Sequence, residues 1–400
     1  MRWKHATSVL ASSGLLTVGG LAVPITATAD TSPTVTIGVG HSDPANQNGF
    51  NGNPVISYTD FFGRSVSVHR GDTIDFQTQP TEFHSIAVAP AVIPLPVFYA
   101  DTDDAPAKGT GLPKVGGGPG LGKAFEPTTC GAQGTDPCVF DGTHAVDAGG
   151  IAGFDQNGPA AIDWNVQIAS NTPIRDYAYF CYIHPGMQGV LHVVDSTATS
   201  DTGNQLETQS SQDQFAADQS EATSLISADN SAAPSGAAGS RTWSVHVGDT
   251  PSSRHTSILG MMPNNLPNVV SGDTVRFLWG ALDPHSVGFG PDQFLPQPFG
   301  WDCGKSYVGI PPSNGPPPPP PPCTEFENGQ PEIVLDPGTR GPGQGLNAQQ
   351  VTDSGVLVGS AYGVNPGAES WSVAAAQPGA YQYHCTVHDF MVGTIRVSGA

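Results

Sequence analysis

Residues 179–187 read YFCYIHPGM, and residues 383–391 read YHCTVHDFM. In both segments a Cys, a His and a Met stand three residues apart, and a Gly-x-x-x-Val strand pattern follows. The spacing lets the three side chains share one tight loop between two strands. These two segments therefore predict a pair of similar β-rich units, each with a cluster of metal-binding side chains at a loop.

A second feature repeats upstream of each loop. Residues 71–76 read GDTIDF and residues 272–277 read GDTVRF, and a histidine, His84 or His285, lies thirteen residues after the first Gly. The order of features is thus the same in both halves of the chain, which is the signature of an internal repeat. A His on one strand and a Cys-x-x-His-x-x-Met loop are expected to meet in each half.

The composition favours short strands and turns over long helices. The 400 residues include 50 Gly and 38 Pro, and short segments that alternate polar with apolar residues recur at 35–39, 65–69, 73–76, 164–168 and 190–194. Counterparts occur at 243–247, 274–279, 371–374 and 394–397. The prediction is an all-β protein built from two β-sandwiches.

The recurring side chains are donors of one chemical kind. A thiolate and two imidazoles suit copper in both oxidation states, and a thioether can add a weak axial contact. A structural zinc site would normally have four Cys or His ligands, which leaves each Met unexplained. The sequence therefore predicts two type 1 copper sites, with the ligands His84, Cys181, His184 and Met187 in the first half and His285, Cys385, His388 and Met391 in the second.

These motifs resemble those of the cupredoxin, or blue copper, family. The Cys-x-x-His-x-x-Met spacing is most similar to the amicyanin branch, within a wider amicyanin/plastocyanin-like likeness. The resemblance covers the strands and the ligand loop of each half. It implies two Greek-key β-sandwiches, each with one copper ion that cycles between Cu(I) and Cu(II), and electron exchange at the exposed edge of His184 and His388.

The segments outside the repeats suggest an exported two-domain chain. Residues 1–29 resemble a secretory signal peptide cleaved near Ala29, and no later stretch is long and apolar enough to span a membrane. We expect domains at 30–195 and 241–400, joined by a disordered, acidic, Ser/Ala/Gln-rich linker at 196–240 that has one aromatic residue, Phe215. Residues 212–225 allow a transient helix within the linker.

Six cysteines in an exported chain favour disulfides. Cys130 with Cys138, and Cys303 with Cys323, lie close in sequence within long inserts between the ligands, so they are expected to form one bridge in each half. The second insert also holds seven consecutive prolines at 316–322, which favour an extended polyproline II segment.

The function expected from these features is electron transfer by a secreted copper protein. The formal net charge of -21 disfavours nucleic acid as a partner, and the expected partner is a redox protein or a copper-handling protein. Copper sequestration or delivery is the alternative. A copper oxidoreductase of the nitrite reductase type is less favoured, because Phe180 stands where such enzymes carry a His and the remaining histidines, including His246 and His255, show no ligand spacing.

Overall fold

The computed structural model describes residues 34–40, 53–78, 84–95, 98–101, 114–117, 123, 130–131, 136–149, 154–155, 158–159, 163–290, 299–302, 332–335, 345–346, 352–354, 357, 359, 370–388 and 390–399. The chain divides into two units, Met1–Thr31 and Ser32–Ala400, and every element described below lies in the second. The predicted signal peptide, the pair Cys303 and Cys323, and the proline run at 316–322 lie outside the described residues.

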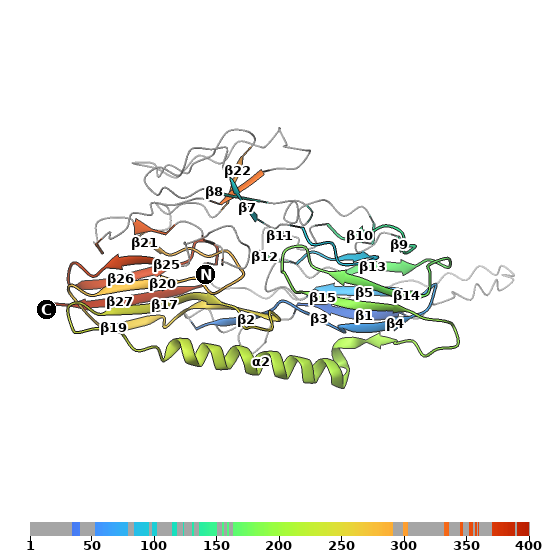
Figure 1. Ribbon diagram of the computed structural model, residues 1–400, viewed down its shortest axis with the longest axis horizontal. Coiled ribbons are helices and arrows are strands. Elements are labelled where there is room, and N and C mark those ends of the chain that lie inside the picture. Colours follow the sequence, from blue (N-terminus) through green and yellow to red (C-terminus); the bar gives the residue numbers. More distant parts are fainter. Residues whose placement is uncertain are drawn as a thin grey trace, which may run out of the picture. The chain divides into compact units, whose positions relative to one another are not determined.

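The first half of the repeat contributes two facing sheets (Figure 1). One has the order β16-β1-β5-β13-β9, and β3 also pairs with β1; its strands are β1 (Thr34–Val39), β3 (Phe61–Phe62), β5 (Thr73–Thr78), β9 (Cys138–Phe140), β13 (Asp163–Ile168) and β16 (Gly203–Asn204). The other has the order β10-β6-β14-β15-β4, with β4 (Ser65–Val68), β6 (Ala87–Ala89), β10 (Val146–Asp147), β14 (Arg175–Phe180) and β15 (Gln188–Val193).

The second half, together with β2 of the first half, forms an equivalent pair of sheets. One has the order β2-β18-β17-β20-β25, with β2 (Val55–Tyr58), β17 (Thr242–Asp249), β18 (Thr256–Met262), β20 (Thr274–Leu278) and β25 (Ser370–Ala374). The other has the order β19-β27-β26-β21-β24, with β19 (Asn265–Val270), β21 (Gly288–Phe289), β24 (Thr352–Asp353), β26 (Gly379–His384) and β27 (Val392–Ser398).

Each pair of sheets encloses its own hydrophobic core, because alternate residues of the strands point inward. In β5 and β13 every second side chain is buried, and Phe76 lies opposite Trp164 in the ladder. Phe277 and Trp371 occupy the corresponding places on β20 and β25. The ring centroids are 5.5 Å apart in the first pair and 5.7 Å apart in the second, so the repeat extends to the packing of the cores.

The turn before β5 and the turn before β20 both depend on glycine. Gly71 has a φ of 92° and Gly272 has a φ of 96°, a left-handed conformation that other residues adopt only with strain. The Asp that follows each Gly is buried and accepts backbone hydrogen bonds within the turn: Asp72 from His69, and Asp273 from Val270. These contacts explain why both halves carry a Gly-Asp pair before the strand.

A strand of the first half joins a sheet of the second half. Strand β2, from the first half, pairs antiparallel with β18 of the second half, and Ser57 lies opposite Ser257 at the centre of the ladder. The inserts also pair with each other, in a sheet of order β22-β23-β8-β7 formed by β7 (Phe98–Asp101), β8 (Lys114–Gly117), β22 (Phe299–Asp302) and β23 (Glu332–Leu335). A small hairpin joins β11 (Phe154–Asp155) to β12 (Gly158–Pro159).

The segment expected to be a disordered linker is folded in part, which corrects that expectation. It contains a short 3-10 helix at Gln205–Glu207 and the helix α2 (Gln209–Asn230), whose N-terminus is capped by the Thr208 hydroxyl. Phe215 of α2 stacks on Tyr58 of β2 with the ring centroids 4.6 Å apart. Phe215, Ala222, Leu225 and Ile226 complete a cluster with apolar residues of β2 and β18. The apolar residues are few, but helical spacing places them on one face.

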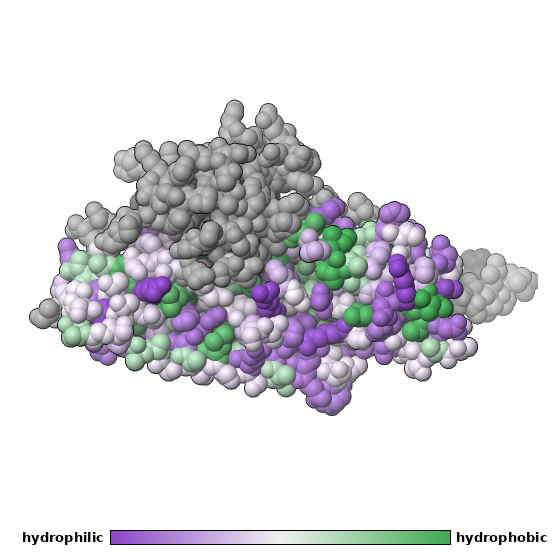
Figure 2. Space-filling model, viewed as in Figure 1, coloured by the Kyte–Doolittle hydropathy of each residue, from purple (hydrophilic) through white to green (hydrophobic). Residues whose placement is uncertain are grey.

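The all-β prediction is confirmed, with α2 as the long helix among the described residues. No helix in the described part of the chain is long and apolar enough to cross a membrane. The described surface in Figure 2 is largely polar, with apolar residues in small separate groups. The predicted domain limits at 195 and 241 stay a prediction.

Candidate metal centres

The first centre lies at one end of the first core. His84 precedes β6, and Cys181, His184 and Met187 occupy the loop between β14 and β15. The Nδ1 atoms of His84 and His184 are 3.0 Å apart, and Sγ of Cys181 is 3.5 Å from Nδ1 of His184. Two backbone hydrogen bonds hold the loop, from the Cys181 amide to the Met187 carbonyl at 3.0 Å and from the Met187 amide to the His184 carbonyl at 3.0 Å.

The second centre has the same construction. The Nδ1 atoms of His285 and His388 are 3.1 Å apart, and Sγ of Cys385 lies 4.0 Å from each of them. The Cys385 amide donates to the Met391 carbonyl at 3.0 Å and the Met391 amide donates to the His388 carbonyl at 2.9 Å. The residues predicted from the sequence therefore come together twice, with the two loops closed by matching hydrogen bonds.

All four ligand positions of the first centre are buried, with exposed fractions of 1% for His84, 6% for Cys181, 5% for His184 and 1% for Met187. Met187 packs in the same core as Cys181, and Met391 packs in the same core as Cys385. The donor atoms that converge are two ring nitrogens and one sulfur in each centre.

The arrangement of these donors fits a metal ion. Two Nδ1 lone pairs and a sulfur that face one another at 3.0 to 4.0 Å repel unless a proton or a cation lies between them. The Nε2 atoms of His84 and His285 are buried without a hydrogen-bond partner. They face Gly40 and Gly248, where an added Cβ would lie 2.4 Å from the ring nitrogen. Each ring is thus held with Nδ1 toward the other donors.

The sulfur atoms sit among groups that stabilise a thiolate. Burial alone would raise the pKa of Cys181, but the imidazoles of His184 and His84 outweigh it and hold the pKa well below its usual value. The pKa of Cys385 is lowered in the same way by His285 and His388 against the effect of burial. Backbone amides of Ser85 and Ser286 point to the two sulfurs at 3.5 and 3.3 Å. A deprotonated thiol is the form that binds metals.

The expectation of an exposed His184 edge is wrong. Nε2 of His184 lies 3.5 Å from a carboxylate oxygen of Asp283, which belongs to the second half and stands two residues before His285. Asp283 is itself buried and accepts a short hydrogen bond from the hydroxyl of Ser257. Val387, in the second ligand loop, packs against the core of the first half. The sequence could not reveal this, because it depends on how the halves pack.

The disulfide expected between Cys130 and Cys138 is confirmed. Within the part of the chain that the structure describes, Cys181 and Cys385 are the free cysteines, and both are buried. Neither is therefore paired with the other, which leaves both thiols for the two centres.

Two further groups of polar residues were missed from the sequence. Asp60, Asp218 and His255 form one, and Asp229, His246 and Asp249 form the other. Each combines an Asp of α2 with residues of distant strands or turns. The sequence offered no recognised motif for them, because in each group the Asp of α2 meets the other two residues only when α2 packs on the sheets.

Comparisons with known proteins add little. No family model and no curated protein matches the chain. Similar solved structures include a copper-containing nitrite reductase from Thermus scotoductus SA-01, with 13% identity and a TM-score of 0.22 over 92% of this chain and 68% of that one. A blue copper oxidase from Nitrosomonas europaea has 10% identity and a TM-score of 0.19 over 91% of this chain and 85% of that one.

The dithionite-reduced auracyanin from Roseiflexus castenholzii has 15% identity and a TM-score of 0.19, and it covers 41% of this chain and 99% of its own. Because these TM-scores are low, we infer neither fold nor function from them. The case for the chemistry of the two centres rests on the chain's own residues.

Proposed function

We propose that this protein is an exported electron-transfer protein that binds two copper ions, one at each Cys-His-His-Met centre. The observation that carries the proposal is the convergence of two Nδ1 atoms and one thiolate sulfur, repeated in both halves. Three donors of this softness favour copper, and a buried Met beside each set suits a weak axial contact. The Cys-x-x-His-x-x-Met spacing is the feature shared with the amicyanin branch of the cupredoxins.

A bound copper ion would supply one-electron chemistry, and the protein would supply a ligand set that changes little during the cycle. The ligand loops are closed by backbone hydrogen bonds, and all the ligands of the first centre are buried. Preorganised ligands lower the reorganisation that accompanies electron transfer. Amide donors to sulfur stabilise the thiolate and are a means to tune the reduction potential.

The contact between the halves gives the two centres a short link made of one ion-pair contact and a covalent segment of chain. It runs from His184 through Asp283 to His285. Burial alone would raise the pKa of Asp283, but His184 holds it below its usual value, so the carboxylate stays charged beside the ring. In the proposed function, electrons pass between the two centres within one chain before they leave to a redox partner.

The decisive experiment loads the purified chain, without residues 1–29, with Cu(II). We expect two copper ions per chain, an intense thiolate-to-copper absorption band in the visible, and the small copper hyperfine splitting of a type 1 site by EPR. Zinc titration serves as a comparison, because zinc would fill a Cys-His-His site without colour. A colourless protein that holds no copper after dialysis would refute the proposal.

Two further measurements separate electron transfer from copper delivery. Rapid reduction and reoxidation without loss of metal supports a carrier. Transfer of Cu(I) to a chelator on reduction supports delivery instead. Turnover of nitrite would assign the chain to the oxidoreductase class.

A further inference from the structure

The helix α2 meets the sheets at two groups of buried and partly buried polar residues, each made of two aspartates and one histidine. They differ in how the charge of the carboxylates is balanced. The difference points to a function for the second group that is independent of copper at the two cysteine-containing centres.

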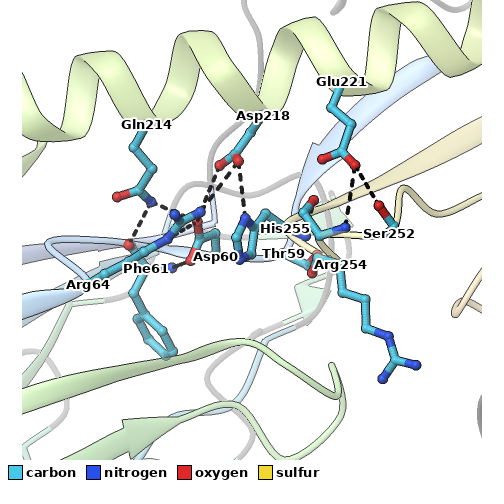
Figure 3. A network of polar contacts seen from close by, with 11 residues as sticks. Thr59, Asp60, Phe61, Arg64, Gln214, Asp218, Glu221, Ser252, Arg254 and His255 are labelled. Atoms are coloured by element: carbon cyan, nitrogen blue, oxygen red, sulfur yellow. Dashed lines mark hydrogen bonds and ion pairs between the residues drawn. The ribbon is translucent and has the colours of Figure 1, made fainter.

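In the first group an arginine supplies the positive charge (Figure 3). The guanidinium of Arg64 forms a short ion pair with Asp60 and lies 3.0 Å from Asp218 of α2. Nδ1 of His255 is 3.2 Å from the same Asp218, and Gln214 of α2 donates to Asp60. Two carboxylates are thus met by one full positive charge and one imidazole.

The second group holds the same residue types without an arginine. Nδ1 of His246 lies 3.6 Å from Asp229 at the end of α2 and 3.3 Å from Asp249 at the end of β17. The side chain of Asp229 is only 7% exposed, and its Oδ2 atom has no hydrogen-bond partner. Among the described residues, the ion pairs of Asp229 and Asp249 are those with His246.

This leaves a site with more negative than positive charge, in which Asp229 is buried and His246 and Asp249 are partly buried. Burial, reinforced by the neighbouring carboxylate of Asp249, raises the pKa of Asp229 to about 6 against the opposing effect of His246. Charged groups that are buried without a counter-charge are costly, so the site has to take up either a proton or a cation. A divalent cation would balance the two carboxylates while the imidazole remains neutral.

The spacing of the ligand atoms matches such a cation. Zinc binds His nitrogen and carboxylate oxygen at about 2.0 to 2.2 Å, which places tetrahedral ligands roughly 3.4 Å from one another. The two measured separations, 3.3 and 3.6 Å, lie on either side of this value. His246 is one-quarter exposed, so the site is open to solvent.

The fold also leaves space for the third ligand, the Asp249 carboxylate. Gly280 lies beside Asp249, and an added Cβ would come within 2.3 Å of the Asp249 carboxylate. The amide of Thr250 donates to the same oxygen, Oδ1, at 2.7 Å. One oxygen of Asp249 is thereby held by the backbone, and the other faces His246.

We propose that Asp229, His246 and Asp249 bind one divalent metal ion of the zinc type. The ion joins the C-terminal end of α2 to β17, as Arg64 joins the middle of the helix to the turn at Asp60. The two contacts together attach the helix to both halves of the chain.

The test uses the full chain with Cys181→Ser and Cys385→Ser, so that no thiolate competes for the probe, which is Zn²⁺. Zinc bound per chain is measured by equilibrium dialysis and metal analysis, and the thermal midpoint is recorded with and without zinc. In this background, His246→Gln and Asp229→Asn each weaken binding at one site by more than about 100-fold, since even outer-shell partners of a metal account for 10- to 100-fold.

The matched control is His255→Gln, in the group that Arg64 already neutralises. It leaves the bound zinc and the zinc-dependent rise of the thermal midpoint unchanged. Asp229→Asn without metal should fold normally, because it removes a buried charge, and this separates loss of the site from loss of the fold. The imidazoles of the cysteine-free centres retain the same amount of zinc in all variants. This zinc therefore does not affect the difference in bound zinc between a variant and the parent. Equal zinc binding in the parent and His246→Gln, or equal loss in His255→Gln, overturns the proposal.

Discussion

Replacement of Arg64 by Met should reveal how strongly the first polar group holds α2 in place. Met keeps the apolar stem but removes the cation that faces Asp60 and Asp218, whose side chains are only 2% and 6% exposed. Loss of one partner from a buried ion pair typically costs about 3 to 5 kcal/mol. Arg64 is 35% exposed and His255 remains beside Asp218, so we expect the lower end, about 3 kcal/mol.

The assay is urea unfolding at pH 7, followed by tryptophan fluorescence, with the thermal midpoint as a second measure. A loss of about 3 kcal/mol corresponds to a shift of roughly 6 °C or more for a domain of 150 to 250 residues. The control is Arg175→Met, because Arg175 lies over the Tyr177 ring and donates to the carbonyl of Gly142 rather than to an acid. We expect Arg175→Met to lower the unfolding free energy by less than about 1 kcal/mol.

The pH dependence provides an internal check on the cause. In Arg64→Met, burial without the guanidinium raises the pKa of Asp60 above its unfolded value further than in the parent, where burial already raises it. An acid whose pKa is raised on folding binds more protons when folded, so stability increases as the pH falls. The loss of unfolding free energy in Arg64→Met relative to the parent should therefore be smaller at pH 5 than at pH 7. A deficit under about 1 kcal/mol at pH 7, or one that is equal at both pH values, would falsify this account.

The remaining predictions concern the metal centres and the second sheet. Cys181→Ser and Cys385→Ser should each remove one copper and about half of the visible absorbance, and retention of the full absorbance in either variant would contradict the assignment. Gly248→Ala should perturb copper binding at His285, since the added Cβ would lie 2.4 Å from its Nε2; Gly203→Ala, which has a similar positive φ but open space, should leave the EPR spectrum intact. Hydrogen bonds from Trp243, Val270 and Arg241 overcome burial and lower the pKa of Asp273 to about 2, so its contribution to stability is present above about pH 4 and disappears as the pH falls through 2. The gap in unfolding free energy between the parent and Asp273→Asn, measured by circular dichroism, should close over that range.

Much of each candidate metal centre was predictable from the sequence because its chemistry is local. Cys, His and Met at three-residue intervals occupy one loop whatever the rest of the chain does, and the repeat of the Gly-Asp turn identified the partner histidine, which lies just before a neighbouring strand. The strands were also predictable, since alternate burial in a sandwich leaves a pattern of period two. These features depend on short stretches of chain and on the repeat between them.

Helix α2 was harder to predict because its sequence is mainly polar and its apolar residues are few. Phe215 stabilises the position of the helix because its ring stacks on Tyr58. Tyr58 lies within reach of the helix only because β2 pairs with β18. The composition of a segment indicates how much apolar surface it can bury, but it does not indicate against which part of the fold the segment packs. The segment was therefore expected to be disordered.

The amino-acid sequence by itself determined the two ligand sets, the all-β character and the internal repeat, because each follows from spacing along the chain. Only the tertiary structure decided which groups surround them. Asp283 of the second half reaches His184 of the first half, and Asp229 reaches His246 because α2 packs on β17. Burial and charge balance are properties of such three-dimensional neighbourhoods, and no local pattern encodes them.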